Sequence, residues 1–193
     1  MSLTKSFDYS LPENHILKRE NLSPKIKAAL LGDPREGWSS HSNFDGYASF
    51  WLRIHNNLRG GSDYLVKGFQ RLLDEAGSNL DEAVNTARLK EVGANVVSFA
   101  HHHHEIEDHN YFPRFVQLYP NVEHAISLLD SDHRVLEEAL DETERALSYL
   151  QNQTADRDAI ARAFNGCQAL QAVLARHLWD EEEIIVPILL ARF

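Results

Sequence analysis

A histidine and a glutamate four residues apart, followed six residues later by a proline, occur twice in this chain. The two copies are His103-x3-Glu107-x5-Pro113 and His177-x3-Glu181-x5-Pro187. Residues four apart lie one above the other on one face of a helix. Imidazoles and carboxylates together are ligands for iron, manganese or zinc. The repeated pattern therefore predicts a metal site that is built from helices.

Two more histidines, His55 and His133, fall on the apolar faces of two other predicted helices. Each alone would be an ordinary half-buried histidine with a hydrogen bond, but a buried imidazole needs a partner, and a shared metal supplies one. The candidate ligands are then His55, His103, Glu107, His133, His177 and Glu181. Four imidazoles and two carboxylates exceed the needs of one tetrahedral ion. They suit two ions if each glutamate bridges both.

The candidate ligand before Glu107 comes from a run of four histidines, His101–His104. We favour His103, because its glutamate stands six residues before a proline, as Glu181 does. The other histidines of the run are expected to be solvated or to lie behind the ligands. The glutamates at 182–183 are expected to face water, since only Glu181 has the spacing of the apolar face.

Four long helices are predicted to position these side chains, because apolar residues recur at helical spacing in each. They cover about 44–76, 80–119, 121–150 and 154 to near the C-terminus. Gly60-Gly61 and Pro113 are expected to kink or loosen the first and second helices. Short connections between long helices are typical of an all-α, antiparallel up-down-up-down four-helix bundle.

The helix ends carry recognisable signals. The Gly77-Ser78-Asn79 cluster is expected to end the first helix, while Asn121 and Thr154 are expected to cap the third and the fourth. Residues 1–42 form an N-terminal extension, and 43–193 form the predicted bundle domain. Within the extension, Ser23-Pro24 and Gly32 predict a short helix over 24–31.

Composition excludes several classes of function. With 43% apolar and 25% charged residues, the chain is expected to form one globular domain. A net charge of −10 argues against nucleic acid and anionic membranes as partners. No apolar run is long enough to span a membrane. The single cysteine, Cys167, permits no internal disulfide and fits a reducing compartment, so a cytoplasmic protein is expected.

Taken together, these motifs resemble the hemerythrin-like (HHE cation-binding) proteins over about residues 44–190. The resemblance is carried by Ile54-His55-x2-Leu58-Arg59, His103-x3-Glu107-Asp108-x3-Phe112-Pro113, Asp132-His133-x2-Leu136 and His177-x3-Glu181-Glu182-x4-Pro187. It implies a four-helix bundle with a non-haem di-iron centre, in which the carboxylates bridge two iron ions. Zinc and manganese are also possible metals.

The ligand set departs from that of the oxygen-carrying hemerythrins, which place a His-x3-His pair on the third helix. Here residue 129 is leucine and residue 137 is glutamate. The set is closer to iron-cluster repair proteins, but these usually carry an N-terminal cysteine, and this chain has none before Cys167. We reject a ferritin-like centre, because it needs Glu-x2-His and this sequence has none. The nearest match is Asp130-x2-His133, and His55 stands where a glutamate would be needed.

The resemblance implies binding of, or reaction with, a small ligand: oxygen, nitric oxide or peroxide. We expect a metal-binding protein in oxygen or redox sensing or stress response rather than a dedicated enzyme, although the same centre could turn over peroxide or nitric oxide. The chain could instead be a metal-dependent interaction or sensor module, to which the extension over 1–42 would contribute, or a repair-like protein. Iron storage is disfavoured because two ions give little capacity.

Overall fold

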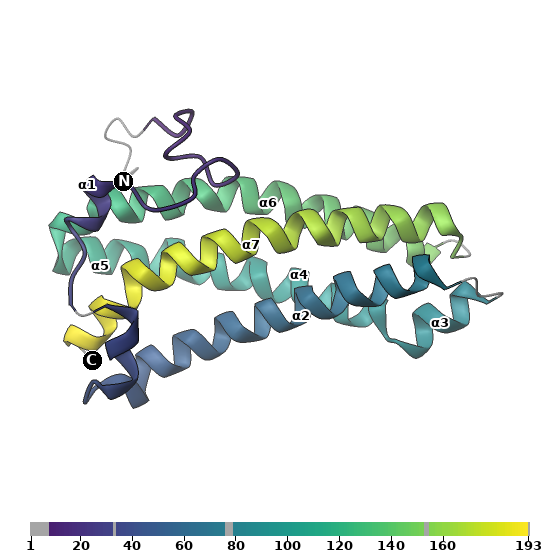
Figure 1. Ribbon diagram of the computed structural model, residues 1–193, viewed down its shortest axis with the longest axis horizontal. Helices are drawn as coiled ribbons and strands as arrows, with labels where there is room; N and C mark the ends of the chain where they lie inside the picture. The colour runs from purple at the N-terminus through teal and green to yellow at the C-terminus, as the bar shows by residue number, and fades with distance from the viewer. Residues whose placement is uncertain (1–7, 33, 76–78, 153–154, 193) are drawn as a thin grey trace. The chain divides into compact units, whose positions relative to one another are not determined.

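The computed structural model describes residues 8–32, 34–75, 79–152 and 155–192. As predicted, the protein is all-α, with the long packed helices of a helical bundle and short helices near the N-terminus (Figure 1). The long helices are α2 (Ser49–Asp74), α4 (Leu89–Ile106), α6 (Glu123–Asn152) and α7 (Arg157–Arg192). None of the helices in the described ranges is long and apolar enough to cross a membrane.

The chain divides into two compact units, and each has an apolar core of its own. The first unit contains residues 1–56, 104–135 and 175–193, and the second contains 57–103 and 136–174. In the first unit the core includes Trp51, Phe112, Phe115, Ile126, Leu129, Ile184 and Ile188. In the second unit it includes Leu65, Phe69, Val84, Leu89, Ile160 and Cys167. The boundary predicted between 1–42 and 43–193 stays a prediction.

The N-terminal segment begins its helix where the sequence predicts. The Ser23 hydroxyl accepts a hydrogen bond from the amide of Ile26, and Pro24 occupies the first turn of α1 (Pro24–Lys27). The helix is shorter than the predicted 24–31. Beyond Ala28 the hydrogen bonds join residues three apart, as in turns. The short 3₁₀ segment η1 (Arg35–Ser40) follows.

The predicted helix over 80–119 is divided into several pieces. Arg88 adopts φ 51°, which separates α3 (Leu80–Thr86) from α4. A single π-helical turn, η3 (Glu107–Tyr111), then precedes α5 (Phe112–Leu118). The amide of Phe112 donates to the Glu107 carbonyl, five residues back. The wider turn accommodates Pro113, whose ring would otherwise press on the carbonyl four residues before it.

The other helix boundaries shift by a few residues. A π-helical turn, η2 (Phe44–Ala48), precedes α2, which continues unbroken through Gly60-Gly61. Gly61 lies directly against the side chain of Val96, so a larger residue would collide there.

Asn121 does not cap α6 but lies in the 3₁₀ segment η4 (Pro120–Val122). At the start of α7, the Asp156 carboxylate accepts from the amide of Ala159 at 2.7 Å. The predicted signals at Gly77, Ser78 and Thr154 lie outside the described residues.

Candidate metal centre

The first unit gathers in its interior six side chains of the kinds that can bind a metal ion. Their relative exposure is at most 4%, and they come from α2, α4, η3, α6 and α7. They are His55, His104, Glu107, His133, His177 and Glu181. Buried ionisable groups need hydrogen bonds, opposite charges or metal ions to offset their desolvation. Such a concentration of them in one interior indicates a functional site.

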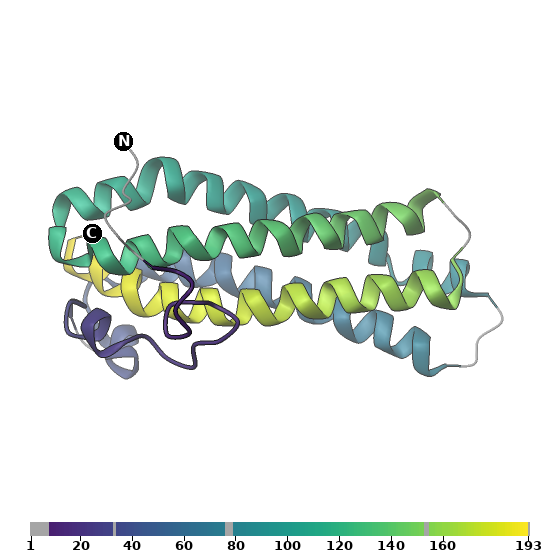
Figure 2. The ribbon, with the colours of Figure 1, turned by 90° about the horizontal axis from the view of Figure 1, so that it is seen from above.

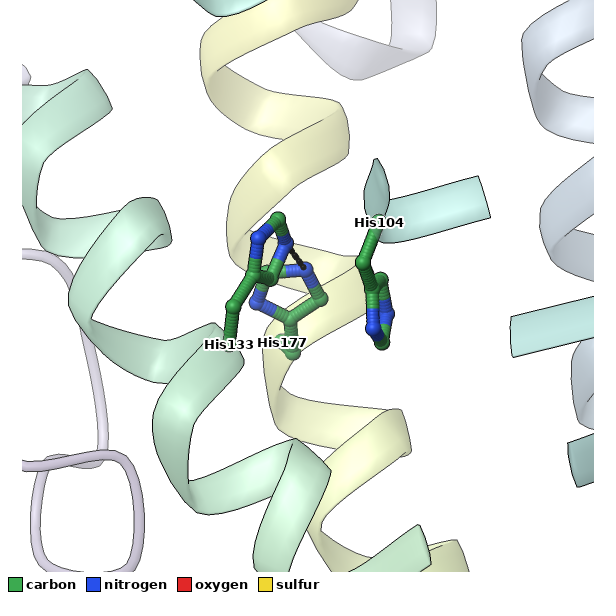
Figure 3. A group of neighbouring side chains, drawn as sticks. All are labelled: His104, His133 and His177. Carbon is green, nitrogen blue, oxygen red and sulfur yellow. Dashed lines mark hydrogen bonds between the residues drawn. The ribbon is translucent and has the colours of Figure 1, made fainter. Parts of the chain in front are cut away.

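Three histidines from three helices form one group. The possible ligand nitrogens of His104, His133 and His177 all lie within 4.8 Å of one another. The Nε2 atoms of His133 and His177 are 3.2 Å apart, and the His104 ring stacks on that of His133 with ring centroids separated by 4.4 Å. Figure 3 shows the three rings gathered together. This is the spacing that one ion held by three imidazoles requires.

His55 and two glutamates form a second group in the same unit. The possible ligand atoms of His55, Glu107 and Glu181 also lie within 4.8 Å of one another, and all three side chains are fully buried. His55 Nε2 is 3.3 Å from Oε1 of Glu181. Both oxygens of Glu181 therefore face imidazoles, because its Oε2 is 3.3 Å from Nε2 of His177.

The glutamates adjoin both groups. Glu107 Oε2 lies 3.5 Å from Nε2 of His133, while Glu181 reaches His177 and His55 through its two oxygens. A carboxylate in this position can share its oxygens between two neighbouring ions. The arrangement of the donors thus fits the bridging role predicted for Glu107 and Glu181.

A second set of carboxylates lies behind the histidines. Nδ1 of His55 is 3.0 Å from Glu182, Nδ1 of His133 is 2.8 Å from Asp108, and Nδ1 of His177 is 3.5 Å from Asp132. Such partners fix the tautomer and the ring orientation of metal-binding histidines. They leave the Nε2 atom of each ring directed at the glutamates or at another histidine. This carboxylate–histidine pattern is typical of metal sites.

The charges within the site favour a cation. Burial, together with the neighbouring charge of Glu181, raises the pKa of Glu107 well above its ordinary value. Burial alone would lower the pKa of His177, but hydrogen bonds and charge interactions with Asp132 and Glu181 raise it to about 9. Burial is likewise outweighed at His55, where Glu181 and Glu182 raise the pKa. Excess negative charge in a low-dielectric interior binds protons or metal ions.

Trp51 holds one of the central carboxylates. Its indole Nε1 donates to Oε1 of Glu181 at 2.6 Å. The indole packs edge-on against Tyr111, with ring centroids 5.0 Å apart, and near Phe115 at 6.3 Å. The aromatic cluster therefore fixes Glu181 and covers this side of the site with apolar surface.

Five of the six predicted ligands meet in the first unit: His55, Glu107, His133, His177 and Glu181. His103 is buried, but it belongs to the second unit and stays a predicted ligand.

One expectation was wrong: Glu182 is buried against His55 rather than facing water. Glu183, by contrast, keeps partial exposure. His104 is buried among the histidines, which excludes the solvated alternative but agrees with a place in or behind the ligand set. The missed partners Asp108, Asp132 and Glu182 are each adjacent in sequence to a candidate ligand, which was the available signal.

The donor set can be matched to a metal by its chemistry. Neutral imidazoles and carboxylates suit iron, manganese or zinc, and six such donors are more than one tetrahedral ion takes up. The residues of the first unit thus fit a two-metal site.

Comparison with known proteins agrees with this geometry. No curated protein and no solved structure matches the chain significantly. The family model described as "Hemerythrin HHE cation binding domain" matches residues 51–189, well over half of the chain. Buried histidine and glutamate groups such as these are typical of the hemerythrin di-metal site. The chain therefore belongs to the hemerythrin HHE cation-binding domain family.

Proposed function

We propose that this protein is a cytoplasmic non-haem di-iron protein that binds or reacts with oxygen, nitric oxide or peroxide, in oxygen or redox sensing or in stress response. The observation that carries the proposal is the convergence of imidazole Nε2 atoms on two buried glutamates, with a carboxylate behind three of the rings. The iron pair, when bound, would supply a coordination position for the small ligand and would exchange electrons with it.

The protein side chains have separate roles in this proposal. The ligand histidines are His55, His103, His133 and His177, and the structure supports adding His104. Glu107 and Glu181 would hold both ions through their carboxylate oxygens. Glu182, Asp108 and Asp132 orient the rings of His55, His133 and His177. Trp51 keeps one Glu181 oxygen in place through its 2.6 Å hydrogen bond.

The burial of the candidate metal centre favours a small ligand over a large substrate. The Phe112 ring stacks on His133 with centroids 5.5 Å apart, and Phe112 and Trp51 both belong to the apolar core of the first unit. These rings exclude bulk water from the histidines and leave the charged groups in an interior of low dielectric, where a metal centre is shielded from solvent. A large substrate would have to displace this packing at considerable cost.

The test is to add nitric oxide, oxygen and peroxide separately to the reduced, iron-loaded protein and to record optical and paramagnetic resonance spectra. We expect at least one of them to produce new bands that Glu107→Ala abolishes. Glu105→Ala is the matched control, because Glu105 is exposed two residues before Glu107. If neither nitric oxide, oxygen nor peroxide changes the spectrum of the iron-loaded protein, the proposal is contradicted.

Catalytic turnover, a sensor role and a repair-like role stay predictions. Consumption of peroxide or nitric oxide in the presence of an added reductant would distinguish an enzyme from a binding protein. An iron-dependent change in oligomeric state would instead favour an interaction or sensor module. Restoration of damaged iron clusters would favour a repair-like role.

A further inference from the structure

Two arginines from the N-terminal segment reach the carboxylates behind the metal-site histidines. Arg19 is buried and forms a two-pronged ion pair with Asp132: Nη1 donates to Oδ1 at 2.8 Å, and Nη2 pairs with Oδ2. Its Nε donates to Oδ2 of Asp180 at 2.8 Å. Arginine suits such a position because its planar guanidinium can donate two parallel hydrogen bonds to a carboxylate.

Arg35 makes the corresponding contact at the other histidine. Its Nη1 donates to Oε2 of Glu182 at 2.6 Å, and its Nε donates to Oε1 of Glu183 at 2.6 Å. The guanidinium lies over the rings of Trp38 and Trp179, at 4.7 Å and 3.9 Å from their centroids. Cation–π contacts of this kind hold the guanidinium in place.

Each arginine is therefore one link from a histidine of the candidate metal centre. Asp132 faces His177 Nδ1 with the same Oδ2 that pairs with Arg19. Glu182 uses Oε1 for His55 and Oε2 for Arg35. The two arginines come from different parts of the N-terminal segment. The histidines that they reach through these carboxylates lie on different helices. Such duplication argues against a chance surface contact.

The N-terminal segment is anchored along its length. We call residues 8–32 and 34–40 the strap; its first part runs beside α6 and α7 within the first unit (Figure 2). Tyr9 donates its hydroxyl hydrogen to Oδ1 of Asp132 at 2.7 Å. Ile16 and Ile26 are buried. Gly32, with φ 71°, passes so close to Pro187 that an added Cβ would lie 3.3 Å from its side chain. The strap is thus a packed part of the unit.

We propose that Arg19 and Arg35 are positioning residues for the metal centre, so that docking of the strap and occupancy of the centre stabilise each other. The inference rests on the proposed metal site but not on which small ligand that site takes. Without its arginine, Asp132 or Glu182 is left as a buried charge that lacks one of its partners and no longer fixes its histidine. Because coupling is reciprocal, bound metal must in turn hold the strap down.

The first test measures metal release. Proteins loaded with Co²⁺ are mixed with excess chelator, and the visible absorption of the cobalt is followed with time. Arg19→Met and Arg35→Met are each expected to release the metal ~10–100-fold faster and to shift the cobalt bands. Lys18→Met is the matched control, since Lys18 is exposed beside Arg19. Arg19→Lys should release the metal more slowly than Arg19→Met, because lysine keeps the positive charge but cannot form the bidentate hydrogen bonds.

The second test uses the unaltered chain, so it does not depend on variants that fold. Trypsin cleavage after Lys18 and Lys27, both exposed in the strap, is compared with and without Co²⁺. We expect the metal to slow cleavage at these sites ~5–150-fold, the range of ordinary coupling energies. Equal cleavage rates in loaded and metal-free protein would overturn the proposal.

The outcomes separate the two claims. If the wild-type chain binds Co²⁺ but folded arginine variants release it at the wild-type rate, with unshifted bands, the strap proposal fails and the metal site stands. If the wild-type chain binds neither Co²⁺ nor iron, the proposed function fails and the strap proposal falls with it.

Discussion

His133 on α6 and His177 on α7 bring their Nε2 atoms to 3.2 Å from each other, while their Nδ1 atoms face Asp108 and Asp132. The outer carboxylates favour a proton on each Nδ1, which leaves both Nε2 atoms with a lone pair directed inward. Two such lone pairs repel unless a proton or a metal ion lies between them. This pair of nitrogens is therefore placed to share either a proton or a metal ion.

The position of His104 leads to the first prediction. Replacing His104 with alanine removes one imidazole from the group that it forms with His133 and His177. The possible ligand nitrogens of these three histidines lie within 4.8 Å of one another. We expect His104→Ala to reduce bound metal from about two ions to about one ion per chain, because a site with fewer ligands holds its ion weakly. Elemental analysis after gel filtration measures the loss.

The neighbouring histidine provides the control. His102 is exposed on the same helix, so His102→Ala should keep the full metal content. Equal metal content in both variants would remove His104 from the ligand set.

Metal uptake should release protons. In the metal-free protein the pKa of His177 is raised to about 9, so its imidazole holds a proton near neutral pH. Burial and the charge of Glu181 also raise the pKa of Glu107. Metal ions displace protons from such ligands. Calorimetric titration with Zn²⁺ in two buffers of different ionisation enthalpy measures the number released. Uptake without proton release would show that these groups are not the ligands.

The raised pKa of His177 also makes the free energy of unfolding of the metal-free protein depend on pH. A histidine whose pKa is raised on folding stabilises the fold below its unfolded value, near 6.5, and this stabilisation is lost as pH rises through about 9. We therefore expect the free energy of unfolding of the metal-free protein to fall between pH 6.5 and pH 9. Urea denaturation at several pH values tests this, and a rise over that interval would contradict it.

Replacing Trp51 tests the hydrogen bond that its indole donates to Glu181. Trp51→Phe keeps an aromatic ring but removes the 2.6 Å hydrogen bond to the carboxylate. We expect the free energy of unfolding of the metal-free protein to drop by about 1.5–3 kcal/mol, the usual value for a hydrogen bond to a charged group. Tyr149→Phe, at a partly exposed ring, is the control and should change stability far less. Denaturation curves that coincide for wild type and Trp51→Phe would refute this role.

Cys167 should be chemically inert. It is buried in the core of the second unit, and burial raises the pKa of its thiol to about 12. Because the thiolate is the reactive form, we expect native protein at pH 8 to resist iodoacetamide while urea-unfolded protein reacts fully. Mass spectrometry counts the added groups. Rapid alkylation of the native chain would mean that this core opens readily.

The helices and most of the ligand set could be predicted because both depend on local spacing. The His/Glu pairs four residues apart and the apolar stripes require only helical periodicity, and the structure has the long helices that they predict. Periodicity could not separate His103 from His104, since neighbouring positions differ by only about 100° around a helix. Both are buried.

Other features depend on contacts far apart in sequence or on unusual backbone. Glu182 is buried because Arg35, far away in the sequence, pairs with it. No spacing rule predicts such a contact. The break at Arg88 arises from a positive φ at a residue that seldom adopts one, and no glycine marks it. The π turn over 107–111 could be anticipated only as a disturbance near Pro113.

The central claim is that the buried histidines and glutamates hold two metal ions. Its most direct test is the metal content per chain of protein expressed in iron-supplemented medium, compared with His177→Ala and with the exposed-site control His109→Ala. We predict about two iron ions per chain in the wild type and in His109→Ala, and a clear loss in His177→Ala. Wild-type protein with almost no bound metal, or His177→Ala with undiminished iron, would contradict the account.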